Sequence, residues 1–244
     1  SRPDLLRLSP PDEPTLLPSV APQHYANRGV TKGDAFLFEY LGPDCRIGYT
    51  YRPAAGFDVA ITCNDKTVHQ TNPDETGPLP VVGGKSVPLS GFETTIDDIR
   101  FEAHVLTYTC RIPDIGTVAY RVRIKGKTLI VDVESEEASF GEFRGPLYGV
   151  IAEEPFIPYL ERRMNARLVN GHYVSSYPDW TVTGCSSLQP LGTTRYAPKT
   201  DGTRNALRER VYATVSPELL EVLPNLPNPA SPFISVLAKK VVFD

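Results

Sequence analysis

Period-two alternation of apolar and polar side chains, interrupted by turn residues, runs through most of this chain. The clearest example is a pair of alternating runs, Thr117–Ile124 and Thr128–Glu134, separated by Lys125-Gly126-Lys127. Successive side chains of a strand point to opposite faces, so each run has one face that can be buried. A short Gly-centred connection between two such runs predicts a β-hairpin. The apolar faces are Val118, Tyr120, Val122 and Ile124 in the first run and Leu129, Val131 and Val133 in the second.

Other segments with strand-type patterning follow one another along the chain, whereas amphipathic helices are almost absent. We therefore predict an all-β protein, a large antiparallel β-sandwich of two sheets with few short helices. Pro158–Arg167 is predicted to be a short helix or a loop, and Ser216-Pro217-Glu218 a helical turn with Ser216 as N-cap. The further predicted strands are Ala35–Leu41, Cys45–Tyr51, Asp58–Cys63, Ile99–Arg111 as one long strand, Ser139–Arg144, His172–Tyr177, Thr193–Tyr196, Leu207–Val215 and Phe233–Phe243.

The 24 prolines divide the chain into three parts. Residues 1–32 are proline-rich and predicted to be irregular, because proline fixes φ and lacks a backbone N–H. Residues 33–232 form the predicted sandwich, with a Gly/Pro-rich loop over residues 72–84. Residues 233–244 are either the last strand or the start of a following barrel domain.

Composition excludes some classes of function. The net charge of −4 lacks the basic excess typical of nucleic-acid binders. No apolar run is long enough to cross a membrane. Nothing fixes the cellular compartment; an extracellular or periplasmic location is the one we favour.

The four cysteines, Cys45, Cys63, Cys110 and Cys185, are too widely spaced for a typical zinc site, and we expect neither a metal nor a cofactor. A hairpin that turns about Ala54 places Cys45 opposite Cys63. Opposed strand residues can lie within disulfide reach, so this pair is either a disulfide or two small unbridged apolar residues.

Several segments resemble the N-terminal β-sandwich of bacterial glycoside-hydrolase-like proteins, which is of the galactose-mutarotase-like supersandwich type. They are Lys125–Ser135, Asn170–Trp180, Tyr196–Arg210, Val215–Leu219 and Leu223–Pro229. The resemblance implies a non-catalytic domain that supports an intramolecular (β/α)8 catalytic barrel and contributes to a carbohydrate cleft.

Two polar segments are candidates for contact with carbohydrate or with that partner domain. Trp180 is the only tryptophan, and an indole face stacks well on sugar rings. Packing in the core or a solvated surface loop are the alternatives. The candidates are His172, Tyr173, Tyr177, Asp179 and Trp180 in the first segment and Lys199, Asp201, Arg204, Arg208 and Arg210 in the second.

Three other functions compete with this interpretation. A free-standing carbohydrate-binding module would use Trp180 and nearby tyrosines as a platform. Glycoside hydrolysis needs two carboxylates about 5–9 Å apart, whereas Glu153 and Glu154 would point to opposite faces of a strand. An aldose-epimerase-like enzyme needs a histidine acid, but the four histidines (His24, His69, His104 and His172) lack the family's Asn-His pair. No catalytic residue is predicted.

Overall fold

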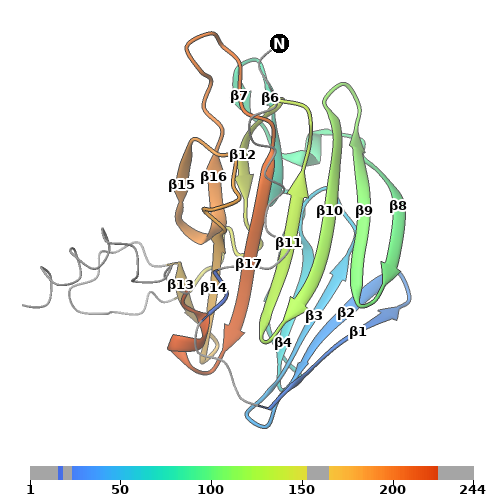
Figure 1. The fold of residues 1–244 in the computed structure, drawn as a ribbon, viewed down its shortest axis with the longest axis vertical. Helices are drawn as coiled ribbons and strands as arrows, with labels where there is room; N and C mark the ends of the chain where they lie inside the picture. Colours follow the sequence, from blue (N-terminus) through green and yellow to red (C-terminus); the bar gives the residue numbers. More distant parts are fainter. Residues whose placement is uncertain (1–15, 19–23, 153–164, 225–244) are drawn as a thin grey trace, which may run out of the picture.

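The computed structural model describes residues 16–18, 24–152 and 165–224, and these residues are organised as antiparallel β-sheets (Figure 1). The only helical elements within these ranges are three short 3-10 helices: η1 (Leu89–Gly91), η2 (Pro190–Gly192) and η3 (Leu219–Val222). The all-β prediction is thus confirmed. There are three sheets in place of the two expected. No helix of the described segments has the length and apolar character needed to cross a membrane.

The first sheet is a five-stranded meander in chain order, β1 to β5. Its first strand lies inside the segment predicted to be irregular, because the only buried residue of β1 is Gly29 and the strand shows little apolar alternation. Pairing with β2 holds β1 in the sheet. The bounds are β1 (Ala26–Lys32), β2 (Ala35–Leu41), β3 (Arg46–Arg52), β4 (Asp58–Cys63) and β5 (Lys66–Gln70).

The second sheet has seven strands in the order β13-β14-β17-β11-β10-β9-β8. The predicted hairpin is confirmed as β10–β11, which closes at the pair Lys125↔Thr128 with Gly126 at φ +57°. A left-handed φ favours glycine at that turn. The bounds are β8 (Thr95–Glu102), β9 (Val105–Ile112), β10 (Gly116–Lys125), β11 (Thr128–Glu134), β13 (Ala166–Val169), β14 (His172–Pro178) and β17 (Arg208–Ser216).

The prediction of one long strand over Ile99–Arg111 is wrong, because the chain turns back at Ala103 and His104 to form the β8–β9 hairpin. Both turn residues have positive φ, +48° and +63°. Residue types without a strong preference for that conformation occupy the turn, so the sequence carries no turn signal there. Strand β8 also has a register shift between Asp97 and Arg100, a β-bulge.

The third sheet includes β6, which lies in the segment predicted to be a Gly/Pro-rich loop. Pro78 and Pro80 are tolerated because they are two residues apart, so their missing N–H groups would both point to the same side of the strand. The N–H of Val81 points to the other side, toward β12, and donates to the carbonyl of Ser139. The two missing N–H groups therefore cost β6 no bond to β12. The strands in spatial order are β15 (Ser187–Gln189), β16 (Thr193–Arg195), β12 (Phe140–Arg144), β6 (Gly77–Val82) and β7 (Lys85–Ser86).

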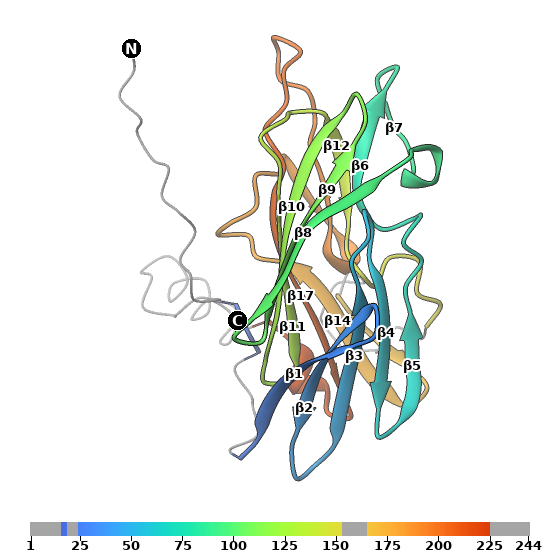
Figure 2. The same ribbon diagram turned by 90° about the vertical axis from the view of Figure 1, so that its right-hand side faces the viewer.

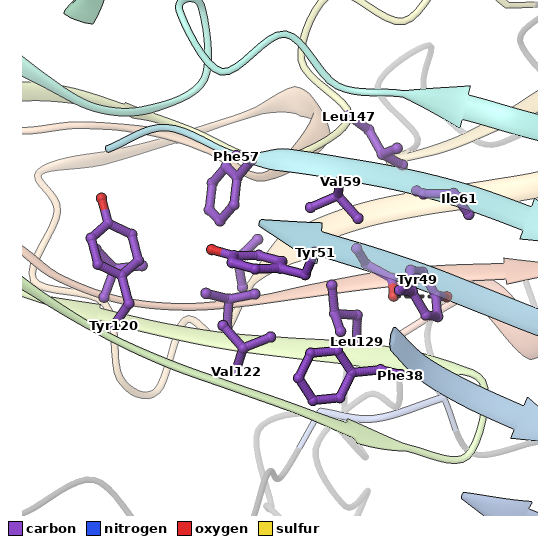
Figure 3. Packing of buried hydrophobic residues seen from close by; sticks show 14 of the residues in the cluster. Phe38, Tyr49, Tyr51, Phe57, Val59, Ile61, Tyr120, Val122, Leu129 and Leu147 are labelled. Carbon is purple, nitrogen blue, oxygen red and sulfur yellow. Dashed lines mark hydrogen bonds between the residues drawn. The ribbon is translucent and has the colours of Figure 1, made fainter. Parts of the chain in front are cut away.

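One continuous hydrophobic core unites the three sheets, with the first sheet and the seven-stranded sheet facing each other across it (Figure 2). Aromatic side chains of β2 and β3 meet the apolar face of the β10–β11 hairpin there, as Figure 3 shows. Phe38, Tyr49 and Tyr51 are each fully buried. A second, small cluster lies on the opposite face of the seven-stranded sheet and consists of Leu16, Ile130, Tyr177 and Tyr212.

The remaining local predictions have mixed outcomes. The helical turn expected at Ser216 begins later, at Leu219; Ser216 Oγ instead accepts a hydrogen bond from Glu218 N–H at 3.1 Å. Most of Pro158–Arg167 and all of Phe233–Phe243 lie outside the described residues.

Candidate ligand-binding groove

Charged and hydroxyl side chains form a row across the outer face of the seven-stranded sheet, the face turned away from the main core. The row comprises Arg100, Thr107, Arg121, Asp132 and Arg210, one from each of β8, β9, β10, β11 and β17. Each is the registered partner of the next, and directly opposed residues of antiparallel strands project from the same face. Strand pairing alone therefore aligns residues more than a hundred positions apart in sequence.

Asp132 is the electrostatic centre of this row. Its Oδ1 accepts a hydrogen bond from Arg210 Nε at 2.5 Å, and its Oδ2 accepts one from Arg123 at 2.5 Å. Burial by itself lowers the pKa of the Arg210 guanidinium, but the hydrogen bond and charge of Asp132 outweigh burial and raise it. Only 3% of the Arg210 side chain is exposed, so the pair is a fixed, charge-assisted feature of the surface.

Around this row the surface is hollowed into two adjoining depressions, which we call the polar groove. The first has a volume of about 460 Å³ and the second about 840 Å³; Ala119 and Glu134 line both. The first is also lined by Asp98, Arg100, Thr107, Tyr108, Thr109, Tyr120, Arg121, Asp132 and Arg210. The second is also lined by Thr117, Ser135, Glu136, Glu137, Gly184, Ala206, Leu207 and Arg208.

Two of the residues singled out from the sequence lie in the groove. Arg210 lines the first depression and Arg208 the second. Arg208 Nε lies 3.6 Å from Glu134 Oε1, so these two side chains form an ion pair on the groove wall. Arg208 and Arg210 thus pair with carboxylates of this same chain, Glu134 and Asp132.

The Tyr177–Trp180 segment has a structural role instead. Tyr177 donates from its hydroxyl to the carbonyl of Leu16 at 2.8 Å, and Trp180 is half-buried against the same small apolar cluster. Asp179 is fully buried, and its carboxylate accepts hydrogen bonds from the hydroxyls of Tyr212 (2.6 Å) and Thr181 (2.5 Å). Neither Trp180 nor Asp179 lines the groove.

The loop with Lys199, Asp201 and Arg204 is held by its own hydrogen bonds. Asp201 Oδ1 accepts from both the backbone N–H and the hydroxyl of Thr203, at 3.0 and 2.7 Å, and these bonds lower the pKa of the Asp201 carboxyl. Arg204 Nε donates to the carbonyl of Tyr196 at 3.1 Å. The loop is a self-contained turn outside the groove.

The histidines also lie away from the groove lining. His172, at the start of β14 beside Tyr173, has its Nδ1 3.0 Å from the carbonyl of Asn170. His104 Nδ1 contacts the backbone of Gly29, and burial lowers the pKa of His69. Neither these three nor His24 meets the groove carboxylates, and Glu153 and Glu154 lie outside the described residues.

A buried lysine forms a polar cluster that sequence reasoning missed. Lys127, 3% exposed, donates to Asp44 (2.5 Å), to Glu221 and to Ser216 Oγ (3.0 Å), and its ammonium lies 5.4 Å from the centre of the Tyr40 ring. A lysine in the turn of a hairpin normally lies in solvent, so its sequence context gave no signal of burial. The cluster ties the first sheet and η3 to the β10–β11 turn.

A search for metal sites finds no group of three or more His, Cys, Asp or Glu side chains suitably placed within the part of the chain that the structure describes. No model of a known protein family matches the chain, and no curated protein is significantly similar to it.

Proposed function

We propose that this chain is a non-catalytic β-sandwich that binds carbohydrate in the polar groove. The observation that carries the proposal is the row Arg100–Thr107–Arg121–Asp132–Arg210, laid across five strands of a rigid sheet. Guanidinium and carboxylate groups form paired hydrogen bonds with neighbouring hydroxyls, and a fixed array of them selects a ligand by the spacing of its polar groups.

The groove differs from an aromatic platform. Its two lining tyrosines, Tyr108 and Tyr120, are at most 3% exposed and belong to the core. Stacking on a ring face therefore contributes little, and hydrogen bonds carry the affinity. With two adjoining depressions of about 460 and 840 Å³, the groove suits several sugar units of a chain better than one monosaccharide.

The arrangement supports binding rather than hydrolysis. A glycosidase needs one carboxyl that stays protonated and a second that is free to attack or to activate water. Asp132 instead forms ion pairs with two guanidinium groups, those of Arg123 and Arg210. Chemistry on the bound sugar would belong to another domain.

Support of a (β/α)8 barrel is the accompanying proposal that the sequence resemblance implies. A supporting face should present a continuous apolar patch. The exposed large apolar side chains of the described residues are instead spread over separate elements, among them β6, β8, β15 and η3: Val82, Ile99, Leu188 and Leu220. The groove is therefore the better-supported functional surface.

A glycan array followed by titration calorimetry tests carbohydrate binding. We expect an oligosaccharide to bind, and Arg121→Ala to weaken it about tenfold or more, because a charge-assisted hydrogen bond contributes roughly 1.5–3 kcal/mol. Arg52→Ala is the matched control, since Arg52 is a half-exposed arginine of the first sheet whose nearest acids are Asp34 and Asp58. Binding that survives Arg121→Ala but is lost with Trp180→Ala would move the site to the Trp180 segment. The absence of any glycan ligand would refute the proposal.

A further inference from the structure

Two cysteine thiols lie together beneath the first sheet, beside the Lys127 cluster. Strands β3 and β4 pair with Ile47 opposite Cys63, so Cys45, two residues before Ile47, lies on the same face and diagonal to Cys63. The sequence-based register, with the two cysteines directly opposed, is thus off by two residues. Both thiols are free in this structure, and the Cys45 thiol donates to Asp44 Oδ2 at 3.4 Å.

Their surroundings make the two sulfurs chemically unequal. The neighbouring Cys45 thiol, His172 and Lys127 lower the pKa of the Cys63 thiol, against the opposing effect of burial. The neighbouring Cys63 and burial raise the pKa of Cys45. A thiolate is the reactive form of cysteine, so Cys63 is the nucleophile and Cys45 its neighbouring thiol.

The position of the pair at the strand ends gives a small oxidant a short path. Cys63 directly precedes the exposed turn Asn64–Asp65, and Cys45 follows the β2–β3 connection. Both side chains are nearly inaccessible in the closed structure, at 0% and 5% exposure. Local opening of the terminal pairs of β3 and β4 would expose them.

We propose that Cys45 and Cys63 are a redox-active dithiol, which a peroxide converts into a disulfide linking β3 to β4. The Cys63 thiolate attacks one oxygen of hydrogen peroxide, the O–O bond breaks, and hydroxide leaves, giving a sulfenic acid. The Cys45 sulfur then attacks the Cys63 sulfur, the S–O bond breaks, and the hydroxyl leaves as water with the Cys45 proton. Two thiols and one peroxide thus give one disulfide and two waters.

The disulfide would raise the thermal stability of the protein by cross-linking the chain beside the Lys127 cluster. Linking Cys45 to Cys63 closes a loop that contains the whole of the β3–β4 hairpin. A loop of this size lowers the entropy of the unfolded chain, and we expect the melting temperature of the oxidised protein to be higher by about 5–10 °C. A thiol reductant should reverse the shift.

Peptide mapping after peroxide treatment and alkylation tests the proposal directly. Trypsin does not cleave between Arg52 and Pro53, so the expected product is peptide 33–46 joined to peptide 47–66. Cys110 is the internal control, because it is buried in the core and its pKa is raised to about 11, and it should remain alkylated. Alkylation of both Cys45 and Cys63 after peroxide, or oxidation of Cys63 to a sulfinic acid without a link, would overturn the proposal.

A pair of variants separates the roles of the two sulfurs. In Cys45→Ala we expect Cys63 to stop at the sulfenic acid, which dimedone traps, and the melting-temperature rise to disappear. In Cys110→Ala the disulfide should form as in the parent chain. If dimedone labels Cys45 in Cys63→Ala faster than it labels Cys63 in Cys45→Ala, the proposed order of reaction is wrong. The mapping of the unsubstituted protein stands even if a variant fails to fold.

Discussion

Among single side chains, Lys127 is the one whose substitution should lower the stability of the protein most. Its ammonium lies between the carboxylates of Asp44 and Glu221 and is almost fully buried. Lys127→Met leaves the two acids without their shared cation, and removing one partner of a buried ion pair costs roughly 3–5 kcal/mol. We expect a loss of that order in urea unfolding. Lys66→Met, at an exposed position of β5, should change stability by less than about 0.5 kcal/mol. Equal effects of the two substitutions would contradict this account.

Glu209 makes stability depend on pH. Its Oε1 accepts from Thr194 (2.5 Å) and Tyr196 (2.6 Å), Oε2 has no hydrogen-bond partner among the described residues, and burial raises the pKa of the carboxyl from 4.5 to about 7. The folded state therefore binds the proton more tightly than the unfolded state does. This contribution is fully present below pH 4.5 and is lost as the pH rises through 7, a change of about 3 kcal/mol.

Replacing Glu209 by Gln should remove that dependence. Urea unfolding at pH 5 and pH 8 is expected to show a smaller difference for Glu209→Gln than for the parent chain. Glu218→Gln, at an exposed position, is the control and should leave the difference unchanged. A parent chain that is equally stable at both pH values would rule out the role given to Glu209.

At the level of strands and turns, the β8–β9 hairpin can be improved. Ala103 adopts a φ of +48°, a conformation that Asn tolerates better than Ala. Ala103→Asn should therefore stabilise the protein by about 0.5–1 kcal/mol in urea unfolding. Ala197→Asn, at an exposed position without a positive φ, should give no gain. A loss of stability in Ala103→Asn would show that the turn is constrained by something other than its backbone conformation.

Turn chemistry also explains which strands the sequence could reveal. The β10–β11 hairpin was predictable because Gly126 separates two strongly alternating runs. The β8–β9 turn was not, since Ala103 and His104 carry no turn preference. Strand β6 could not be predicted because Pro78 and Pro80 normally indicate that a segment is not a strand. Prolines are compatible with a strand only where no neighbouring strand needs their N–H groups, and the sequence does not show which strands are neighbours.

For the fold as a single unit, the shared core predicts cooperative unfolding. Side chains of all three sheets belong to one continuous cluster, so unfolding of one sheet would expose core residues of the other two. Trp180 is the only tryptophan and reports from the outer face of the seven-stranded sheet. Its fluorescence and the far-UV circular dichroism should change at the same denaturant concentration. An earlier transition in fluorescence would indicate that the outer face unfolds separately.

The groove shows where reasoning from sequence stops. Arg208 and Arg210 could be chosen from a dense polar segment, but their acidic partners could not. Asp132 meets Arg210 only because β17 crosses over to pair with β11, 78 residues earlier in the chain. Local alternation says which face of a strand is polar; it does not say which strands are neighbours. A site built across strands is therefore visible only once the order of the sheet is known.

The bulge in β8 has a consequence for how copies of this chain behave when concentrated. That strand forms one border of the seven-stranded sheet, and its unpaired backbone groups could template another polypeptide. The extra residue twists the ribbon there, and Asp97, Asp98 and Arg100 crowd the same stretch with charge. A foreign strand cannot dock along this border without burying those charges, so the kink acts as a safeguard against polymerisation into fibrils.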